Sequence, residues 1–359
     1  MINNRLERLR NKFADEEIDA FIISQAENRR YISGFEGSSG FVLVTAQKAV
    51  LATDFRYTEQ AVSQSPNCEI LRIANNMDDW LPKLLGELGV RRPGFEAGDI
   101  TVEVHQQLTK ALKQKQIAAE LVPITGLVES LRAVKEAGEI ELIREAVAIA
   151  DAAFDGVEGT IKAGLTEQQV AWEIEKHLRE NGSQPVPFEI IVASGPNSAL
   201  PHAKPSARVI NAGEPVLIDM GARYGGYTSD LSRTIYVGEA DATFKRVYSA
   251  VLDAQLEAMS IIKEGTTGHQ ADSYARKVIE KAGYGEAFGH ALGHGLGLAA
   301  HELPRLGPNS HEKLSEGMVF TVEPGIYLSG WGGVRIEDTV TIEKGKVAAM
   351  SKAKKVRYD

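Results

Sequence analysis

The chain contains one cysteine, Cys68, so no disulfide can form within it, and it suits a reducing compartment. It has no run that approaches the roughly 20 consecutive apolar residues of a membrane-spanning helix. Residues 1–10 are mostly polar and charged, which argues against a secretory signal peptide. From these absences we expect a cytoplasmic protein.

Basic residues are fewer than acidic residues. The chain has 40 lysines and arginines and 49 acidic residues, so the net charge is −9. This balance offers no broad basic surface, so we expect neither nucleic acid nor a membrane as a partner. What the chain does have is length: 359 residues with 43% hydrophobic content exceed the usual size of one hydrophobic core, which predicts two domains.

Residues 1–125 alternate short apolar runs with helical patterns, which is typical of an α/β domain. We expect strands at 20–24, 41–44 and 49–52, the last two forming a hairpin, and helices at 77–88 and 102–116. A short strand-like run then leads through proline and glycine into a different pattern. We therefore place a second domain at residues 126–359.

The second domain contains an internal repeat. Gly164-Leu165-Thr166 matches Gly265-Thr266-Thr267 at an offset of 101 residues, and each copy is a helix, a glycine-containing turn and a second helix. Thr166 and Thr267 each precede a glutamine by three residues, the spacing of a capping box. Gly182 and Gly283 suit the left-handed position just past a helix end. A chance match between amphipathic helices is the alternative explanation.

Two β-rich segments follow each helix pair. In the first half, 215–221 and 227–237 flank a glycine-containing turn, and in the second half 318–327 and 334–342 do the same. Both read as antiparallel hairpins. The predicted fold class is α/β (α+β), with a second domain of two αα-hairpin and antiparallel-sheet halves related by a pseudo-twofold axis.

Acidic residues inside these apolar strands require an explanation, because burying a charge is costly unless it is paired or binds metal. They are Asp219, Asp230, Glu323 and Glu337. Each turn centre lies midway between the members of a pair, so we expect Asp219 opposite Asp230 and Glu323 opposite Glu337. One such carboxylate alone would suit a salt bridge or a strand cap. Four together repel one another unless cations lie between them, and two divalent ions match their charge.

Three of the eight histidines, His290, His294 and His301, fall within one short glycine-rich stretch. Glycine on both sides of His294 allows a close approach to a metal, and imidazole favours transition metals over magnesium or calcium. His202 and His301 are 99 residues apart, close to the repeat offset, so we expect them on opposite sides of the site. The apolar neighbours of His290 leave a role in the core open.

With their local motifs, these residues resemble the five metal ligands of the proline-specific pita-bread metallopeptidases, which include Xaa-Pro dipeptidase (prolidase), aminopeptidase P and, more distantly, methionine aminopeptidase. The matching positions are Asp219, Asp230, His294, Glu323 and Glu337. The resemblance covers residues 130–359 and, more weakly, 34–38 and 53–57. It implies a creatinase-like N-terminal domain, a pita-bread catalytic domain and a homodimer. It also implies two divalent ions, manganese first, with cobalt or zinc as alternatives.

The resemblance assigns roles as well. It implies that Asp219 and Glu337 bridge the two ions, that Asp230 holds one, and that His294 and Glu323 hold the other. In such a site a water between the ions is available as hydroxide near neutral pH, and Glu323 would also take its proton.

Further side chains would surround the reacting bond. His202 and His301 would stabilise the tetrahedral intermediate and hold the proline side of the substrate, and His290 could join them. Arg335 lies two residues before Glu337, so both side chains point to one face of a strand and Arg335 would orient the carboxylates. An ordinary salt bridge is the alternative role for Arg335.

The substrate would be a small peptide with proline at its second position. A dipeptidase must recognise a free carboxylate one residue past the cleaved bond, and Arg305 is our candidate for that contact. If Arg305 is an ordinary surface arginine, aminopeptidase P, which acts on longer peptides, becomes the better description. The complete ligand set argues against a catalytically inactive binding protein and against a metal-independent, creatinase-type enzyme. The extra N-terminal domain argues against methionine aminopeptidase.

Overall fold

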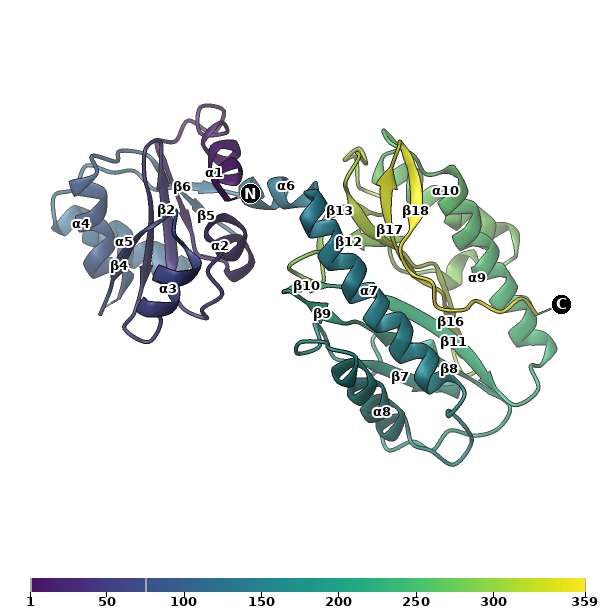
Figure 1. Cartoon of the computed structure of the whole chain (residues 1–359). Coiled ribbons are helices and arrows are strands. Elements are labelled where there is room, and N and C mark those ends of the chain that lie inside the picture. Colours follow the sequence, from purple (N-terminus) through teal and green to yellow (C-terminus); the bar gives the residue numbers. More distant parts are fainter. Residues whose placement is uncertain (1, 75, 359) are drawn as a thin grey trace. The chain divides into compact units, whose positions relative to one another are not determined.

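The computed structural model describes residues 2–74 and 76–358, which divide into two compact units, Met1–Arg132 and Ala133–Asp359 (Figure 1). The first unit extends a few residues past the expected boundary at 125 because most of helix α6 (Leu127–Ala133) packs with it. The Tyr31 hydroxyl donates to the carbonyl of Leu131 at 3.2 Å, for example. None of the described helices is long and apolar enough to cross a membrane.

The first unit is built on one mixed six-stranded sheet. Its strand order is β4-β3-β2-β1-β5-β6. The strands β1, β5 and β6 run parallel, β3 and β4 run parallel, and β2 is antiparallel to both of its neighbours, which confirms the predicted hairpin. The strands are β1 (Ala20–Ile23), β2 (Phe41–Thr45), β3 (Ala49–Thr53), β4 (Glu69–Arg72), β5 (Pro93–Glu96) and β6 (Val122–Ile124).

Five further helices accompany this sheet: α1 (Ile2–Arg10), α2 (Ala26–Ser33), α3 (Thr58–Gln64), α4 (Met77–Glu87) and α5 (Val102–Gln114). Leucines of α4 and α5, among them Leu81 and Leu108, form one hydrophobic core with Ile22 and Phe95 of the sheet. Helices α1 and α2 contact β2. The unit is therefore an α/β domain, as its alternating sequence pattern predicts.

The second unit begins with a helix pair and an antiparallel sheet. Helices α7 and α8 pack on a three-stranded sheet of order β11-β8-β7 through a shared core that includes Phe154, Ile174 and Ile218. A two-stranded ribbon, β9 with β10, lies at the hairpin tip. The elements are α7 (Ala137–Glu158), α8 (Glu167–Glu180), β7 (Ile191–Ser194), the 3₁₀ helix η1 (Gly195–Ala199), β8 (Glu214–Met220), β9 (Arg223–Tyr224), β10 (Tyr227–Thr228) and β11 (Leu231–Val237).

The rest of the second unit repeats this plan. Helices α9 and α10 pack on a five-stranded sheet of order β13-β12-β14-β17-β18, and β15 pairs with β16 at the hairpin tip. In Figure 1 the two helix pairs are teal and green. The elements are α9 (Ala242–Ile261), α10 (Gly268–Lys281), η2 (Gly285–Ala287), β12 (Gly293–Gly295), β13 (Glu302–Leu306), β14 (Val319–Val322), β15 (Gly325–Leu328), β16 (Gly332–Arg335), β17 (Asp338–Glu343) and β18 (Lys346–Ala349).

The signals that predicted the repeat match the local geometry of both copies. Thr166 and Thr267 each form a capping box at the start of the second helix. Gly182 and Gly283 follow those helices with φ angles of 98° and 87°, in the left-handed region that favours glycine. The structure thus confirms two αα-hairpin and antiparallel-sheet halves, the predicted fold class.

The expected register of the first hairpin is wrong by two residues. Asp219 pairs with Ser232, and the same register puts Asp230 across from Gly221. The cause is the turn, which is centred on Gly225 and Gly226, both with positive φ, as a tight two-residue hairpin turn requires. Because the slip is two residues, the predicted face is unchanged.

The second hairpin has the expected register. Val322 pairs with Asp338 and Gly325 pairs with Arg335, so Glu323 and Glu337 lie across from each other. The prediction succeeds here because the flanking glycine-rich turn is centred where the sequence suggests.

The two halves meet along β11 and the start of β17. The Thr339 hydroxyl donates to the carbonyl of Asp230 at 2.8 Å, and the Glu337 amide donates to the carbonyl of Ser232 at 3.1 Å. By their positions in the two hairpins, Asp230 corresponds to Glu337 and Ser232 to Thr339, so the two contacts join corresponding residue pairs, one through a side-chain hydroxyl and the other through a backbone amide. These contacts between corresponding residues bring both acidic hairpins to one place.

Candidate metal centre

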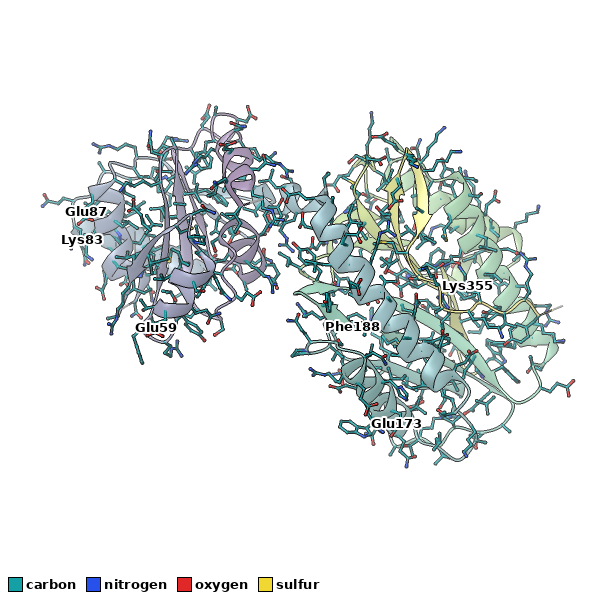
Figure 2. The ribbon with its side chains drawn as sticks, in the orientation of Figure 1. Glu59, Lys83, Glu87, Glu173, Phe188 and Lys355 are labelled. Carbon is teal, nitrogen blue, oxygen red and sulfur yellow. The ribbon has the colours of Figure 1, made fainter. Side chains whose placement is uncertain are left out.

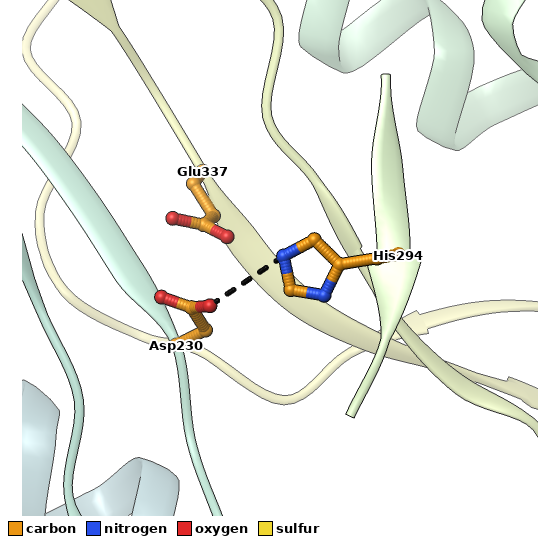
Figure 3. Close-up of side chains that lie close together, drawn as sticks. All are labelled: Asp230, His294 and Glu337. Atoms are coloured by element: carbon orange, nitrogen blue, oxygen red, sulfur yellow. Dashed lines mark ion pairs between the residues drawn. The ribbon is translucent and has the colours of Figure 1, made fainter. Parts of the chain in front are cut away.

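Three side chains distant in sequence converge where the halves meet. Ligand atoms of Asp230, His294 and Glu337 all lie within 4.8 Å of one another, as Figure 3 shows. The His294 Nε2 atom is 3.7 Å from Asp230 Oδ2 and 3.3 Å from Glu323 Oε1. Carboxylates and an imidazole at such separations form a donor set suited to a transition-metal ion.

The backbone around His294 requires glycine. A Cβ atom on Gly293 would lie 2.1 Å from the carbonyl oxygen of Thr321, and one on Gly295 would lie 2.0 Å from that of Leu303. Only glycine therefore lets β12 fit between β13 and β14 at this point. The ring of His294 is then oriented by its own strand, since Nδ1 is 3.1 Å from the Gly295 carbonyl oxygen. That oxygen can only accept, so Nδ1 carries the proton and Nε2 keeps its lone pair.

Helix α10 holds the loop that leads into β12. Asp272 accepts from the amide of Leu292 at 3.0 Å, and Arg276 is paired with Asp272 at 2.9 Å. Arg276 also donates to the carbonyls of Phe288 and His290. The sequence between α10 and His294 is thus fixed although it has little regular structure.

The predicted carboxylates have some partners and also keep open oxygens. Asp219 Oδ2 accepts from Arg335 at 2.7 Å, and Glu337 Oε2 accepts from the Ser232 hydroxyl at 2.8 Å. Asp219 Oδ1 and Glu337 Oε1 are buried and accept no hydrogen bond among the described residues. An unpartnered buried carboxylate oxygen is costly, and a cation would remove that cost. The residues present therefore fit a bound metal.

The pKa shifts of the site residues also favour a bound cation. Burial raises the pKa of Asp230 and of Glu337 well above the ordinary range, and repulsion from the other carboxylates adds to the effect. Burial also raises the pKa of Glu323. Burial lowers the pKa of His294, which favours the neutral imidazole that binds metal. The site thus resists holding several negative charges without a compensating cation.

Arg335 and Tyr327 form a second polar cluster beside the carboxylates. Arg335 Nη1 donates to the Tyr327 hydroxyl at 2.9 Å, and its Nε donates to Ser232 at 2.8 Å. His290 Nε2 is 2.9 Å from the Tyr327 hydroxyl, while Nδ1 faces the Ala291 carbonyl at 2.8 Å. Since that carbonyl can only accept, Nε2 must accept from Tyr327. The structure therefore places His290 in this cluster.

His301 and His202 lie at the open side of the site. The His301 ring centroid is 4.1 Å from that of His294, and its own side chain is exposed. His202 is also exposed, and its charge would lower the pKa of both His290 and His301, although burial is the larger cause for each. The chain on both sides of His202 is anchored by buried Glu167, which accepts from Ser194 and Ser206 among other groups.

Arg305 is exposed on β13 and pairs directly with His294 in the antiparallel register. Its charge contributes to lowering the pKa of His294, after burial. The structure thus brings every predicted site residue to the region around His294, with Arg305, His301 and His202 as the exposed members.

Tyr327 and Ser232 are site residues that the sequence reasoning missed. Both lie at even spacings from a predicted ligand, since Tyr327 is four residues after Glu323 and Ser232 is two after Asp230, and side chains at even spacing in an extended chain point the same way. No local sequence pattern marks the hydroxyls of Tyr327 and Ser232 as parts of a site.

Comparisons with known proteins place this geometry in a family. Residues 141–344 match metallopeptidase family M24, and residues 5–134 match the creatinase/prolidase N-terminal domain. These two matches correspond to the second and the first compact unit.

Similar proteins extend over the full chain. The solved structure of an Xaa-Pro dipeptidase from Bacillus anthracis has a TM-score of 0.95 and 42% identity, with 99% of each chain covered. That of an X-Pro aminopeptidase from Thermotoga maritima has a TM-score of 0.88 and 38% identity, with 97% of each chain covered. An Xaa-Pro dipeptidase of Pyrococcus horikoshii is 36% identical over 356 residues, which is 99% of each protein.

Proposed function

Because this chain belongs to metallopeptidase family M24, we propose that it hydrolyses the peptide bond between any residue and a following proline. The observation that carries the proposal is the convergence of Asp230, His294 and Glu337 on one point of the second unit. The names of its relatives, which include Xaa-Pro dipeptidases over nearly the whole chain, supply the substrate class.

We propose that five side chains hold two divalent ions. The resemblance implies Asp219 and Glu337 as the bridging pair, but the grouping of Asp230, His294 and Glu337 favours Asp230 and Glu337 as the residues shared by both ions. Asp219 would then complete one site, and His294 with Glu323 would complete the other. The unpartnered buried oxygens of Asp219 and Glu337 support metal binding by both residues. Manganese is the proposed ion, with cobalt or zinc as alternatives, since carboxylates and one imidazole suit all three.

When bound, the ions would lower the pKa of a water between them and polarise the scissile carbonyl. The protein's own residues would manage the proton and the substrate. The Glu323 carboxylate accepts a hydrogen bond from the Thr321 hydroxyl at 2.9 Å, and burial raises its pKa above the ordinary value, which makes it a stronger proton acceptor. Glu323 is therefore the proposed proton acceptor.

The remaining side chains would bind the peptide. His301, whose ring lies next to that of His294, and His202 would donate hydrogen bonds to the carbonyl oxygen as negative charge develops on it, and would hold the proline side. Arg335 would keep Asp219 in place and, through Tyr327, fix the ring of His290. His290 would contribute a wall of the substrate site.

We propose a dipeptidase because Arg305 pairs with His294 across the sheet and is exposed. A guanidinium at this position could bind the free carboxylate of a dipeptide's proline in bidentate fashion. An Xaa-Pro aminopeptidase is the second candidate, and the similarity to the Thermotoga maritima X-Pro aminopeptidase favours it.

The test is the turnover of an Xaa-Pro dipeptide and of a tripeptide that starts with the same two residues, with Mn²⁺ and with a chelator. We expect hydrolysis of the dipeptide only in the presence of metal. Faster cleavage of the tripeptide would identify an aminopeptidase. Undiminished hydrolysis by chelator-treated, metal-free protein would exclude the metal mechanism.

We also propose a cellular location, an oligomeric state and a class of partner for this protein. The single cysteine supports a reducing location, the cytoplasm. A homodimer follows from the resemblance to the proline-specific family and can be checked by light scattering. Small peptides with proline at the second position are the proposed partners, and neither nucleic acid nor a membrane is expected to bind.

A further inference from the structure

The C-terminal segment, residues 350–358, has no helix or strand, yet its backbone is closely bound to the second unit. The amide of Met350 donates to the carbonyl of Thr339 at 2.9 Å. Asp151 on α7 accepts from the amides of Lys352 at 2.7 Å and Ala353 at 3.0 Å. The segment therefore attaches to a helix of the first half.

The end of the segment attaches to the second half. The amide of Val356 donates to the Tyr248 hydroxyl on α9 at 3.2 Å, and the Tyr358 ring packs edge-on against Tyr248 with centroids 5.0 Å apart. Arg357 pairs with Asp253 of the same helix at 3.1 Å, on the surface. The C-terminal segment thus spans both helix layers behind the junction where the candidate metal ligands meet.

A buried chain of charges runs from this segment into the sheet. Lys355, labelled in Figure 2, is paired with Asp338 and donates to Gln255 at 3.1 Å. Asp338 is also paired with Arg233 at 2.8 Å, and the side chains of Asp338 and Arg233 are 1% and 2% exposed. Arg233 returns to the segment by donating to the carbonyl of Ala353 at 2.7 Å.

This chain of charges leads to the candidate ligands by two routes. Arg233 donates to the backbone carbonyls of Ser232, at 2.9 Å, and of Glu337. On the other route, the Ser351 hydroxyl accepts from the Thr339 amide at 3.0 Å, and the Thr339 hydroxyl donates to the Asp230 carbonyl at 2.8 Å.

Neighbouring residues on a strand point to opposite faces, so the side chains of Arg233 and Asp338 lie on the face away from those of Ser232 and Glu337. The side-chain contact between Ser232 and Glu337 at 2.8 Å fits this division. The charged chain therefore fixes the backbone of the ligands from behind, without competing for their metal-binding oxygens.

We propose that the C-terminal segment positions the metal centre, and that Lys355 is the positioning residue through which it acts on Glu337. The inference rests on the metal centre of the proposed function. Lys355 balances the buried Asp338 and so holds the Arg233–Asp338 pair, and with it the Glu337 backbone, in one arrangement. Loss of the ammonium leaves Asp338 paired with Arg233, so the fold should survive while the ligand geometry loosens.

The experiment compares Lys355→Met with Arg357→Met in the full-length protein. Both variants remove one cation from the same segment, but Arg357 faces solvent and pairs with Asp253 instead of Asp338. Mn²⁺ affinity is measured by calorimetric titration of metal-free protein, and thermal unfolding is followed by circular dichroism. Partners behind metal ligands typically change affinity by about 10- to 100-fold, so we expect Lys355→Met to weaken Mn²⁺ binding by about 10-fold.

Arg357→Met should bind Mn²⁺ with an affinity within about twofold of the unchanged protein, as expected of an exposed pair. Ser351→Ala provides a second, milder variant on the Asp230 route and should also weaken Mn²⁺ binding. Unchanged affinity in both Lys355→Met and Ser351→Ala would overturn the inference, and so would an equal loss in Arg357→Met. If the unchanged protein binds no Mn²⁺, the proposed function itself fails, which is a separate outcome.

Discussion

Arg305 lies directly across from His294 in the antiparallel pairing of β12 with β13. Side chains at directly opposite positions share one face of the sheet, with Cβ atoms about 4.5–5.5 Å apart. Arg305 is therefore an exposed cation directly across the sheet from a proposed metal ligand, and its substitution tests the two candidate substrate lengths.

We expect Arg305→Ala to raise KM for Xaa-Pro dipeptides by about 10- to 100-fold, since a hydrogen bond to a charged group contributes about 1.5–3 kcal/mol. Tripeptides should be affected far less, because their terminal carboxylate lies one residue farther away. Arg305→Lys keeps the charge without the bidentate geometry, so its KM for dipeptides should lie between those of the unchanged protein and Arg305→Ala. Steady-state kinetics on both substrates make the comparison. Equal losses on both, or no loss on either, would favour the aminopeptidase.

Removing a proposed ligand should abolish metal binding without unfolding the chain. Asp219→Asn, His294→Ala and Glu337→Gln should each lose most activity and most bound Mn²⁺, as measured by elemental analysis and by turnover. His311→Ala is the matched control, because His311 is exposed and outside the site. A ligand variant with normal metal content and normal rate would show that the assignment of that residue is wrong.

The stabilisation by metal should grow with pH. Burial, with repulsion from the other carboxylates, raises the folded-state pKa of Asp230 and Glu337 above the unfolded value. Such groups favour folding at low pH, and their contribution is lost as pH rises through the folded pKa. Bound cations replace those protons. Thermal melts at about pH 5.5 and about pH 8 should therefore show a larger Mn²⁺-induced rise in Tm at the higher pH. An equal rise at both would contradict the assignment.

Tyr327→Phe should separate catalysis from metal binding. The lost hydroxyl bonds Arg335 and His290, and neither is a proposed metal ligand. We expect kcat to fall by about 10-fold, which corresponds to about 1.4 kcal/mol in the barrier, while Mn²⁺ affinity stays near that of the unchanged protein. Calorimetry and single-turnover kinetics provide the two measurements. A parallel loss of metal would show that Tyr327 supports the ligands instead.

Much of the second unit is predictable because its signals are local. The capping boxes at Thr166 and Thr267 and the glycines that follow each helix pair depend only on nearby backbone geometry. The acidic residues stand out against apolar strands for the same reason. Local spacing therefore identifies which side chains need an explanation, and the duplicated plan indicates where they meet.

Register and cross-chain contacts are less accessible to sequence reasoning. The place of the first hairpin turn depends on which two of five residues adopt positive φ, and the pair Gly225 and Gly226 shifts the partner of Asp219 to Ser232. The role of Tyr327 depends on Arg335 and His290, which come from different strands and loops. The polar network behind Glu337 involves residues more than 100 positions apart and leaves no local pattern.

The two halves of the second unit supply unlike atoms to the site. Among the proposed metal ligands, the first half offers only the oxygens of Asp219 and Asp230, whereas the imidazole of His294 comes from the second. The position beside the imidazole would therefore fill first with a transition metal, and the all-oxygen position would exchange more readily with harder ions. Loading would then occur in two distinguishable steps, and at limiting manganese the chain would exist as a half-occupied species with one paramagnetic centre.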